Sequence, residues 1–364
     1  MSAFGAAFGR DDARRLTGRP EQAVGAELLT LGDGSERGVR CVRLRSGEIE
    51  VEVIVDRALD LGRASVRGVP VAWISPTGLA GPWFADPHGW GPFRTFAGGL
   101  LTTCGLEHTF GPGSDDASAF GYPGRETHDF PLHGRLSSTP ARLTGYGIDW
   151  DAGEVFCRGD VRQAEVFGAV LVLEREIRIG IGSGAVRIGD RVRNEGYAPT
   201  PQMILYHVNA GWPLVGPGAR VEATVGTPRV ATTAAEGRDW HAVDAPAQGE
   251  VEQVWEHTPI ADGDGLGRAA VVNDDIGDGR ALALEVEFGI ATLPRLLQWR
   301  VMSEGNYVIG LEPGNLRSEG RQAARAAGEL VVLAPGEQRD YDVRLTLHHG
   351  ADAIAGLRAR LGSP

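Results

Sequence analysis

The sequence has few cysteines, and their positions suit neither disulfide bonding nor metal binding. Cys41, Cys104 and Cys157 are odd in number, lie far apart and form no Cys-x-x-Cys pair. We therefore expect no disulfide framework, no metal site and reduced thiols, as in a cytoplasmic protein. The chain has 364 residues, so a hydrophobic core alone can hold the fold together.

The chain also lacks the signals of membrane and nucleic-acid binding. Its first residues, MSAFGAAFGRDDARR, do not have the basic-then-apolar order of a signal peptide, and no apolar run is long enough to span a bilayer. The formal net charge is -12 with no basic stripe, so phosphate backbones and anionic membranes would be repelled. We expect a cytoplasmic monomer or homodimer that binds neither nucleic acid nor membrane.

Motifs of several common enzyme classes are missing as well. The sequence contains no GxxxxGK[ST] phosphate loop, no HExxH and no GxSxG. The run GIGSG at 180–184 joins two predicted strands and does not open a helix, so we interpret it as a hairpin turn. These absences argue against nucleotide-dependent, metalloprotease and serine-hydrolase activities, and we expect no cofactor.

What the sequence does contain is the pattern of many short strands. Its 53 glycines and 21 prolines are scattered as turn-forming pairs. Residues 47–57 alternate charged and apolar positions, and residues 61–75 predict two short strands joined at Arg67-Gly68. Residues 169–196 predict two long strands that meet at 182–184. The clearest helical spacing comes near the C-terminus, in ADAIAGLRARL.

These patterns predict an all-β fold. With no internal repeat and no linker-like break, we expect one domain over residues 1–364, a large antiparallel β-sandwich with few short helices. Residues 1–35 are expected to be an irregular or shortly helical edge segment. Residues 77–140 are rich in Gly, Pro, aromatics and His without clear periodicity, so we expect functional loops there.

Short segments with polar residues in apolar or Gly-rich surroundings are the candidates for chemistry. They are residues 130–135, 204–209 and 310–315. In the second segment, strand alternation places Leu205, His207 and Asn209 on one face and Tyr206 and Val208 on the other. Two polar groups on one buried face are costly unless they are satisfied or serve a ligand. Taken alone, a strand histidine is more often a hydrogen-bonded core residue.

In the third segment, Glu312 follows an alternating strand pattern. Tyr307, Ile309 and Leu311 share one face before Glu312 arrives at the expected strand end. A carboxylate beside apolar neighbours can have a raised pKa, as a base working near neutral pH requires. Taken alone, a glutamate before proline is more simply a solvated turn residue, and His133 in its His-Gly turn is equally open to a structural interpretation.

The order and spacing of these segments resemble the aldose 1-epimerases of the galactose mutarotase-like superfamily. In that family a hairpin leads through an Asn-x-x-x-x-Pro type of turn to a strand with the pattern Asn-His-x-Tyr-Phe-Asn-Leu, and the counterparts here are 194–201 and 206–212. Leu-His-Gly at 132–134 is similar to the family's Leu-His-Gly-Gly turn. Phe-Arg-Thr-Phe-Ala-Gly-Gly at 93–99 is similar to the family's Gly-Arg-x-x-Asn-Arg-Ile segment, which contains a substrate-binding arginine. Leu-Glu-Pro-Gly-Asn at 311–315 matches the position of the family's catalytic glutamate. The resemblance covers about residues 40 to 350.

The resemblance implies a carbohydrate-binding isomerase that interconverts sugar anomers by acid–base ring opening, without a cofactor. His207 would be the acid and Glu312 the base. His133 and Arg94 would hold sugar hydroxyls and stabilise developing negative charge. An apolar platform for the sugar would come from one of four tryptophans, namely Trp83, Trp90, Trp212 and Trp299.

The surroundings of His207 depart from the best-known mutarotases. Tyr206 stands where the family has an asparagine, and Asn209 with Ala210 replaces its Tyr-Phe pair. The blocks at 56–76 and 93–108 are also untypical of those mutarotases and resemble a bacterial side branch of the superfamily whose substrates are largely unassigned. Asn209 and Arg57 are further substrate-binding candidates, although a structural salt bridge explains Arg57 equally well.

Two other functions are compatible with the sequence. One is an epimerase or isomerase acting on an unusual or phosphorylated sugar, which arginines such as Arg135 and Arg300 in the pocket would favour. The other is a non-catalytic carbohydrate-binding protein, because fold does not fix function. A pure binder needs hydrogen-bonding groups but no matched acid and base, so the pairing of His207 with Glu312 favours an enzyme.

Overall fold

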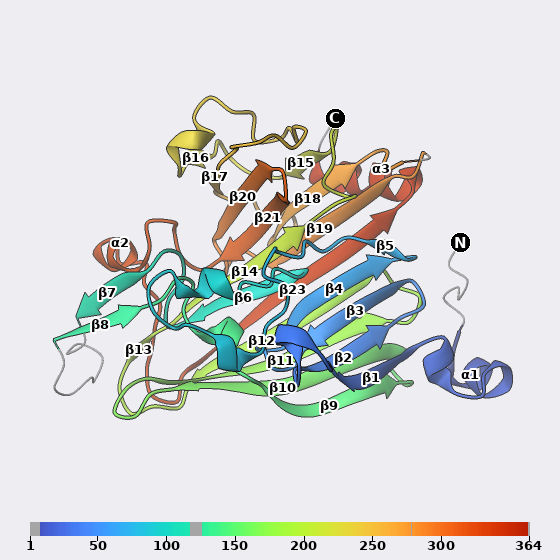
Figure 1. Ribbon diagram of the computed structural model, residues 1–364, viewed down its shortest axis with the longest axis horizontal. Coiled ribbons are helices and arrows are strands. Elements are labelled where there is room, and N and C mark those ends of the chain that lie inside the picture. Colours follow the sequence, from blue (N-terminus) through green and yellow to red (C-terminus); the bar gives the residue numbers. More distant parts are fainter. Residues whose placement is uncertain (1–7, 117–125, 278, 363–364) are drawn as a thin grey trace.

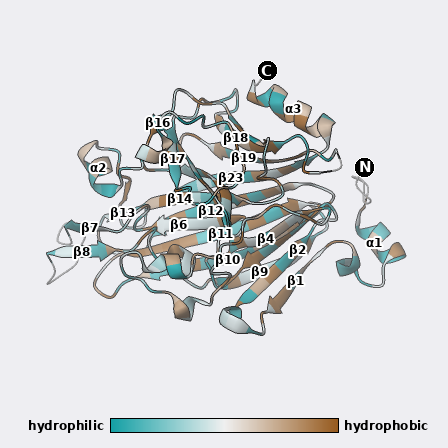
Figure 2. Cartoon of the chain, turned by 45° about the horizontal axis from the view of Figure 1, so that its top comes forward, coloured by the Kyte–Doolittle hydropathy of each residue, from teal (hydrophilic) through white to brown (hydrophobic). Residues whose placement is uncertain are grey.

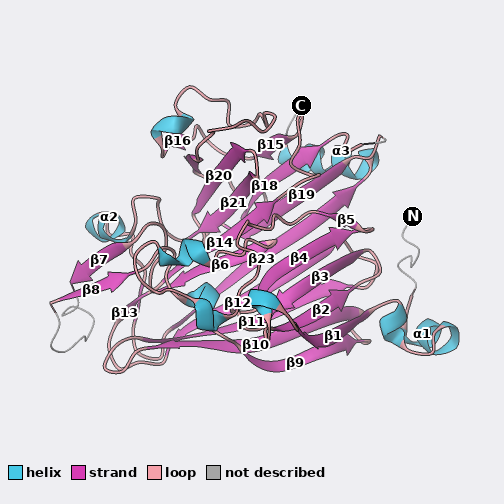
Figure 3. Cartoon of the chain, in the orientation of Figure 1, coloured by secondary structure: helices cyan, strands magenta, loops and turns pink. Residues whose placement is uncertain are grey.

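The computed structural model describes residues 8–116, 126–277 and 279–362. Across these ranges the chain forms two large antiparallel sheets that pack against each other, with short helices at the periphery (Figures 1 and 3). The predicted all-β sandwich is therefore confirmed. The single-domain extent of 1–364 stays a prediction, and residues 1–7, 117–125, 278 and 363–364 of it lie outside the described ranges.

Within the described residues, sheet 1 contains eleven strands, with β5 beside β4 and the others in the order β1-β2-β3-β4-β6-β14-β21-β20-β17-β16. Their bounds are β1 (Gly25–Thr30), β2 (Arg40–Arg45), β3 (Ile49–Ile54), β4 (Asp60–Val66), β5 (Val69–Pro70), β6 (Leu101–Leu106), β14 (Met203–Ala210), β16 (Arg229–Val230), β17 (Gln253–His257), β20 (Arg295–Ser303) and β21 (Asn306–Gly314). Strand β14 therefore lies in the interior of the sheet, between β6 and β21.

Sheet 2, again within the described residues, contains eight strands in the order β15-β18-β19-β23-β12-β11-β10-β9. Their bounds are β9 (Arg142–Asp149), β10 (Glu154–Ala164), β11 (Val170–Gly180), β12 (Ala185–Asn194), β15 (Arg220–Ala223), β18 (Leu266–Asn273), β19 (Leu282–Gly289) and β23 (Gln338–His349). The other described strands and α-helices are two small strand pairs and three helices: β7 (Gly113–Asp116) with β8 (Thr127–Phe130), β13 (Thr200–Pro201) with β22 (Val332–Leu333), α1 (Arg10–Leu16), α2 (Arg321–Ala326) and α3 (Ala351–Leu361). Short 3₁₀ helices lie in the connections between elements.

One cluster of buried apolar side chains fills the space between the two sheets. It takes Val42 and Leu44 from sheet 1 and Ile177 and Ile179 from sheet 2, and all four are almost fully buried. Hydrophobic and hydrophilic residues alternate along the strands because only one face of each strand turns toward this core (Figure 2). Burial of this apolar surface is the main force that holds the sheets together.

An ionic network crosses the same core. Arg175 of β11 donates from Nε and Nη2 to the carboxylate of Asp190 at 2.8 and 2.6 Å, and from Nη1 to Oδ1 of Asp60 at 3.1 Å. Tyr206 of β14 donates to Oδ2 of Asp190 at 2.7 Å. The side chains of Arg175 and Asp190 are 0% exposed. This network joins sheet 2 to the inner face of β14.

Both predicted hairpins and the C-terminal helix are confirmed. Strands β4 and β5 pair around Arg67 and Gly68, whose φ angles of 49° and 80° are those of a tight turn with two left-handed residues. Strands β11 and β12 pair around residues 181–184. Helix α3 occupies residues 351–361, as its spacing predicts.

Two expectations are corrected. The segment 77–140, expected to be loops, contains β6, which lies in the interior of sheet 1. All residues of β6 are buried, so apolar and polar positions do not alternate and the strand gives no period-two signal. The segment 1–35 contains the strand β1 in addition to the short helix α1. This strand lies at the edge of sheet 1, so most of its residues are not buried and its alternation of apolar and polar residues is weak.

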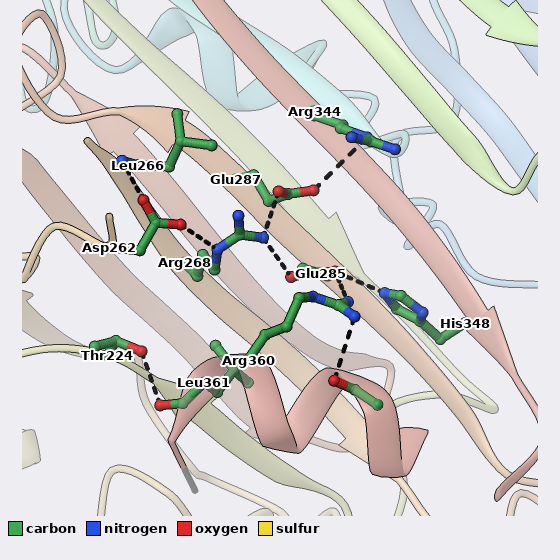
Figure 4. A network of polar contacts seen from close by, with 11 residues as sticks. Thr224, Asp262, Leu266, Arg268, Glu285, Glu287, Arg344, His348, Arg360 and Leu361 are labelled. Atoms are coloured by element: carbon green, nitrogen blue, oxygen red, sulfur yellow. Dashed lines mark hydrogen bonds and ion pairs between the residues drawn. The ribbon is translucent and has the colours of Figure 1, made fainter. Parts of the chain in front are cut away.

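Helix α3 is attached to the outer face of sheet 2. Its buried side chains pack on β18 and β19, and Arg360 donates to Oε2 of Glu285 at 2.9 Å. Glu285 also binds Nε2 of His348 at 2.7 Å and Arg268 at 3.2 Å, in a network that spreads over neighbouring strands (Figure 4). No helix in the described ranges is both long enough and apolar enough to cross a membrane.

Candidate active site

A cavity of about 680 Å³ lies on the face of sheet 1 that is turned away from the core. Strands β14, β20 and β21 supply side chains to its floor, and the connections around residues 73–77, 90–96, 110–111 and 132–133 supply part of its walls. The alternation of β14 explains this placement, because Tyr206 and Val208 enter the core whereas His207 faces the cavity. The face assignment made from the sequence is thus what the structure shows.

His207 is enclosed by aromatic rings. Its backbone pairs with Thr102 of β6, and only 5% of its surface is exposed. The ring centroids of Trp299, Phe96 and His133 lie 5.3, 5.4 and 5.8 Å from that of the imidazole, each in an edge-to-face arrangement. Such edge-to-face packing keeps water away from the imidazole and fixes its orientation.

Glu312 approaches the imidazole from the neighbouring strand β21. Its Oε1 lies 3.1 Å from Nε2 of His207, and the two side chains are only 4% and 6% exposed. Gly310 makes room for this approach, because a Cβ at that position would lie 2.6 Å from Oε1 of Glu312 and 3.3 Å from Cε1 of His207. Glu312 was expected at a strand end, but it lies inside β21, which continues to Gly314.

The close approach of these two side chains leaves hydrogen-bonding capacity unused. Within the described part of the chain, Nδ1 of His207 and Oε1 of Glu312 are buried atoms without a hydrogen-bond partner. The contact of 3.1 Å is therefore not an aligned hydrogen bond. Buried polar groups are nearly always paired in folded proteins, so unpaired ones beside a cavity point to a ligand.

Burial shifts both pKa values toward the neutral forms. Desolvation lowers the pKa of His207 to about 4. Desolvation also raises the pKa of Glu312 well above its usual value, and the negative charge of Glu252 adds to the rise. Both shifts favour a pair that carries a single exchangeable proton and no net charge. Such a pair can give a proton at one atom and take one at the other.

His133 is held beside this pair by its turn. Its φ is 58° and Gly134 follows with 72°, so the chain reverses sharply here. The backbone N–H of His133 donates to the carbonyl of Phe110 at 2.8 Å, and the N–H of Phe110 donates to Nδ1 of His133 at 3.3 Å. Burial lowers the pKa of His133 to about 3, with the neighbouring His207 adding to the effect. His133 thus presents a neutral imidazole to the cavity.

Three other predicted site residues do not line the cavity. Arg94 is 77% exposed and pairs with Asp86 at 2.7 Å. Asn209 is fully buried, and its amide donates to the carbonyls of Gly99 and His207 at 3.0 Å each, so it fixes the backbone of β14 beneath the site. Arg57 donates to the backbone carbonyl of Thr95 at 2.9 Å, and it lines a separate pocket to which His133 also contributes.

Some of the tryptophans and none of the pocket arginines named from the sequence line the cavity. Trp90 and Trp299 line the cavity, whereas Trp83 and Trp212 do not. Neither of the proposed pocket arginines reaches the cavity. Arg135 forms a two-bond ion pair with Glu107 at 2.5 and 2.6 Å. Arg300 is 1% exposed and clamps the segment before β17 by donating to its backbone carbonyls.

Several lining residues were missed by the sequence reasoning. Trp73 lies 5.9 Å from Trp299 by ring centroids, and Phe96 belongs to the segment matched to the family's arginine. Glu252 accepts a hydrogen bond from Nε1 of Trp299 at 3.1 Å, and Arg229 lies at the rim. The aromatic richness of 77–140 was a usable signal for Phe96. Glu252 and Arg229 lie in segments whose sequences carry no distinguishing pattern.

The arrangement is suited to acid–base chemistry. A histidine and a carboxyl lie 3.1 Å apart at the floor of the cavity, and a second histidine lies beside them. Among the described residues, no group of three or more His, Cys, Asp or Glu side chains is placed to hold a metal ion. The groups that line the cavity are of the kinds that can transfer protons and form hydrogen bonds.

The fold and this site define a galactose mutarotase-like protein. The chain is similar to a crystal structure from Klebsiella pneumoniae, provisionally named an aldose 1-epimerase, with 25% identity, a TM-score of 0.82 and coverage of 93% of this chain and 86% of that one. It is also similar to a galactose mutarotase-like protein from Clostridium acetobutylicum (13% identity, TM-score 0.63, 90% and 100% covered). A galactose 1-epimerase from Lactobacillus acidophilus shares the fold (10% identity, TM-score 0.58, 90% and 100% covered).

The family itself is defined by sequence. The chain belongs to the family described as a domain of unknown function, DUF4432, whose model matches residues 36–347. No curated protein matches the chain. The predicted membership of an uncharacterised branch of the mutarotase-like superfamily is therefore confirmed.

Proposed function

We propose that the protein is an aldose 1-epimerase that interconverts the anomers of a sugar by acid–base ring opening. The observation that supports this most directly is the buried pair of His207 and Glu312, 3.1 Å apart, which lines an aromatic cavity and keeps unused hydrogen-bonding atoms. The similarity to proteins named as aldose 1-epimerases agrees with this activity.

The spacing of the pair suits a cyclic hemiacetal. Ring opening breaks the bond between the anomeric carbon and the ring oxygen, while a proton is delivered to the ring oxygen and another is removed from the anomeric hydroxyl. Both oxygens are bonded to the same carbon, so an acid and a base about one hydrogen-bond length apart can reach both of them at once. Closure on the other face of the aldehyde reverses the two proton transfers and yields the other anomer.

The two members of the pair exchange roles during the cycle. The family resemblance assigns His207 as the acid and Glu312 as the base. Burial favours the state in which the proton rests on Glu312 when the site is empty, because both pKa shifts oppose charge. Opening and closing each move one proton through the pair, so the cycle can start from either state. Neutral His133 is placed to hydrogen-bond a sugar oxygen whose charge rises during opening.

The charges of the cavity favour an uncharged sugar over a phosphorylated one. Among its described lining residues, Arg229 is the one arginine or lysine, against Glu252, Glu312 and Glu319. Arg229 is already paired, with Glu256 at 2.6 Å and with Glu319 at 3.1 Å. A phosphate would therefore meet no free cation and would lie close to carboxylates. A binding protein without turnover would, in turn, have no use for the unpaired acid–base pair.

Exchange NMR between sugar anomers tests the proposal. The wild-type protein should accelerate anomer exchange for at least one sugar in a panel of uncharged aldoses. Glu312→Gln and His207→Asn should each lower the exchange rate by about 10²- to 10⁴-fold, because each removes one proton-transfer group. Glu174→Gln makes the same change on the outer face of sheet 2 and should leave the rate unchanged.

The outcomes separate the activity from the residue roles. A wild-type protein that accelerates exchange of no aldose contradicts the epimerase activity. An active wild type with an equally active Glu312→Gln variant contradicts the role of Glu312 alone.

A further inference from the structure

The cavity is larger than the acid–base pair requires. Its volume of about 680 Å³ falls in the middle of the range of about 300–1,000 Å³ that accommodates drug-sized ligands, which exceed a single hexose in size. Its aromatic lining falls into two groups. Trp73, Phe96 and Trp299 form the inner group around His207 and are half-buried, whereas Trp90 and Phe93 line the cavity as an exposed pair. We call these two residues the outer pair.

The outer pair is a preformed aromatic stack that is open to solvent. The rings of Trp90 and Phe93 stack with their centroids 5.5 Å apart and their planes 10° from parallel. They are nevertheless 61% and 53% exposed. Exposed, contiguous apolar surface next to a cavity marks a binding site, since a protein gains nothing for its own stability by leaving it in water. The apolar face of a pyranose ring packs on such aromatic surfaces.

The local structure keeps the outer pair in place without covering it. Both residues belong to one turn, because Trp90 precedes the 3₁₀ helix Gly91–Arg94 and Phe93 lies within it. The Arg94 guanidinium donates to Oδ2 of Asp86 at 2.7 Å, which ties this turn to the preceding chain. Gly91 packs directly on Asp86, where a Cβ would lie 2.3 Å from the carboxyl carbon. Arg94 therefore positions the outer pair.

Polar groups for sugar hydroxyls line the same cavity. Arg229, Ser318 and Glu319 are joined to one another through hydrogen bonds and ion pairs at its rim. An apolar surface combined with a few fixed polar groups is the composition of a specific small-molecule site.

We propose that the outer pair is a second sugar-binding subsite and that the substrate is the reducing-end sugar of a disaccharide or longer chain. The reducing unit lies at His207 and Glu312, and the next sugar unit packs on Trp90 and Phe93. This inference rests on the proposed epimerase activity for the reaction, but the binding step does not require turnover.

Comparison of mono- and disaccharides tests the subsite. Anomer exchange is measured by NMR for glucose and galactose and for maltose, cellobiose and lactose. At least one disaccharide should have a kcat/KM about tenfold or more above that of its own reducing-end monosaccharide. Trp90→Ala should lower kcat/KM for that disaccharide by about 3- to 10-fold, the usual range for one aromatic stacking contact, and should lower the monosaccharide value by a clearly smaller factor. Phe93→Leu, which keeps an apolar side chain, should act in the same direction.

Trp83→Ala is the matched control. Trp83 is a tryptophan of the same segment with a similar exposure of 56%, but it does not line the cavity. It should leave both kcat/KM values unchanged. Binding of methyl maltoside and methyl cellobioside, whose rings cannot open, is measured in parallel by calorimetry with the wild type and with Trp90→Ala.

The outcomes distinguish this inference from the proposed function. If monosaccharides exchange and no disaccharide is preferred, the subsite is wrong and the epimerase activity stands. If nothing exchanges but a methyl disaccharide binds in a Trp90-dependent manner, the activity is wrong and the subsite stands. If Trp90→Ala affects mono- and disaccharides equally, or if no methyl disaccharide binds, the subsite is overturned.

Discussion

The two faces of strand β14 carry two buried clusters of ionisable side chains, and these differ in how completely they are hydrogen-bonded. On the core face, Tyr206 joins Arg175 and Asp190 through hydrogen bonds of 2.6–2.8 Å. On the cavity face, His207 lies 3.1 Å from Glu312, yet within the described residues each keeps a buried atom without a hydrogen-bond partner. Burial is thus almost the same on both faces. Hydrogen-bond satisfaction is more complete on the core face, where the polar side-chain atoms of Tyr206, Arg175 and Asp190 are all bonded and Oδ2 of Asp60 is the buried atom of the network that lacks a partner among the described residues.

This difference separates a structural cluster from a chemical one. A buried charge that is fully paired holds two sheets in register and has no capacity left for a ligand. A buried acid and base that are close but unpaired carry a cost that folding alone does not repay, and perturbed ionisable groups in a cavity are candidates for catalysis. Burial does not distinguish the two clusters, so the comparison depends on which atoms are satisfied.

The largest effect is expected from breaking the core-face cluster. Arg175→Met leaves the carboxylates of Asp190 and Asp60 buried without their cation, and the free energy of unfolding should fall by about 3–5 kcal/mol. Urea denaturation followed by circular dichroism measures this change. Exchange activity per folded molecule should stay near that of the wild type. A stable Arg175→Met protein with lost activity would reverse the roles given to the two faces.

The next-largest effect is expected on the cavity face, where His207 makes the stability of the protein depend on pH. The unfolded state takes up a proton on His207 near pH 6.5, and the folded state does so only near a pKa of about 4. Below pH 6.5 the unfolded state therefore binds more protons, and stability is lost as the pH falls from 6.5 to about 4. The loss due to this one residue is about 3 kcal/mol.

His207→Asn should remove that part of the acid sensitivity. The measurement is urea denaturation of wild type and variant at several pH values between 4 and 7. His349→Asn makes the same substitution at the partly exposed end of β23, outside the cavity, and is the matched control. Equal slopes for wild type and His207→Asn would show that His207 is not held neutral by burial.

Tyr206→Phe should have a smaller and purely structural effect. The variant loses the hydrogen bond to Asp190 but keeps the ring in the core, so unfolding should become easier by about 1.5–3 kcal/mol, as for hydrogen bonds to charged groups. Thermal and urea denaturation report this loss. Because Tyr206 neighbours His207 in the chain but points to the other face, exchange activity should persist. If the Tyr206→Phe protein were fully folded but had lost activity, the core face of β14 would contribute to the chemistry at the cavity face.

The smallest expected effect has the opposite sign. Glu312→Gln replaces a buried carboxyl with a neutral amide of the same shape, so at neutral pH the free energy of unfolding should rise by about 0.5–2 kcal/mol, as is common when a functional residue is neutralised. The raised pKa makes this rise larger at neutral pH than near pH 4, because only the unfolded carboxyl ionises readily between them. A destabilised Glu312→Gln protein would place Glu312 with the structural cluster.

The strand pattern made the faces of β14 predictable before any coordinates. Alternation of Leu205, Tyr206 and His207 gives their directions directly, since the side-chain period of a strand is two. The same logic failed for β6, where both faces are covered and every position is buried. Periodicity detects the contrast between two environments, so a strand with the same environment on both sides is invisible to it.

The site was predictable only in part, because its members come from distant segments. His207 and Glu312 were found by their places in a spaced pattern, and they lie on neighbouring strands. Arg94 was matched to a substrate-binding arginine, but its side chain points outward to Asp86, and the neighbouring Phe96 and Phe93 line the cavity instead. Glu252 reaches the cavity through the pairing of β17 and β20, which no local pattern specifies.

Gly310 shows how a position without a side chain can control the chemistry of its neighbours. The Glu312 carboxyl occupies the volume that a methyl group at 310 would claim, within 2.6 Å of that methyl carbon. Alanine at 310 would therefore compete with the acid–base pair for the same space while leaving both of its members in the sequence. A search for lost activity in relatives of this protein should count position 310 as part of the site, since a relative can keep His207 and Glu312 and still be unable to bring them together.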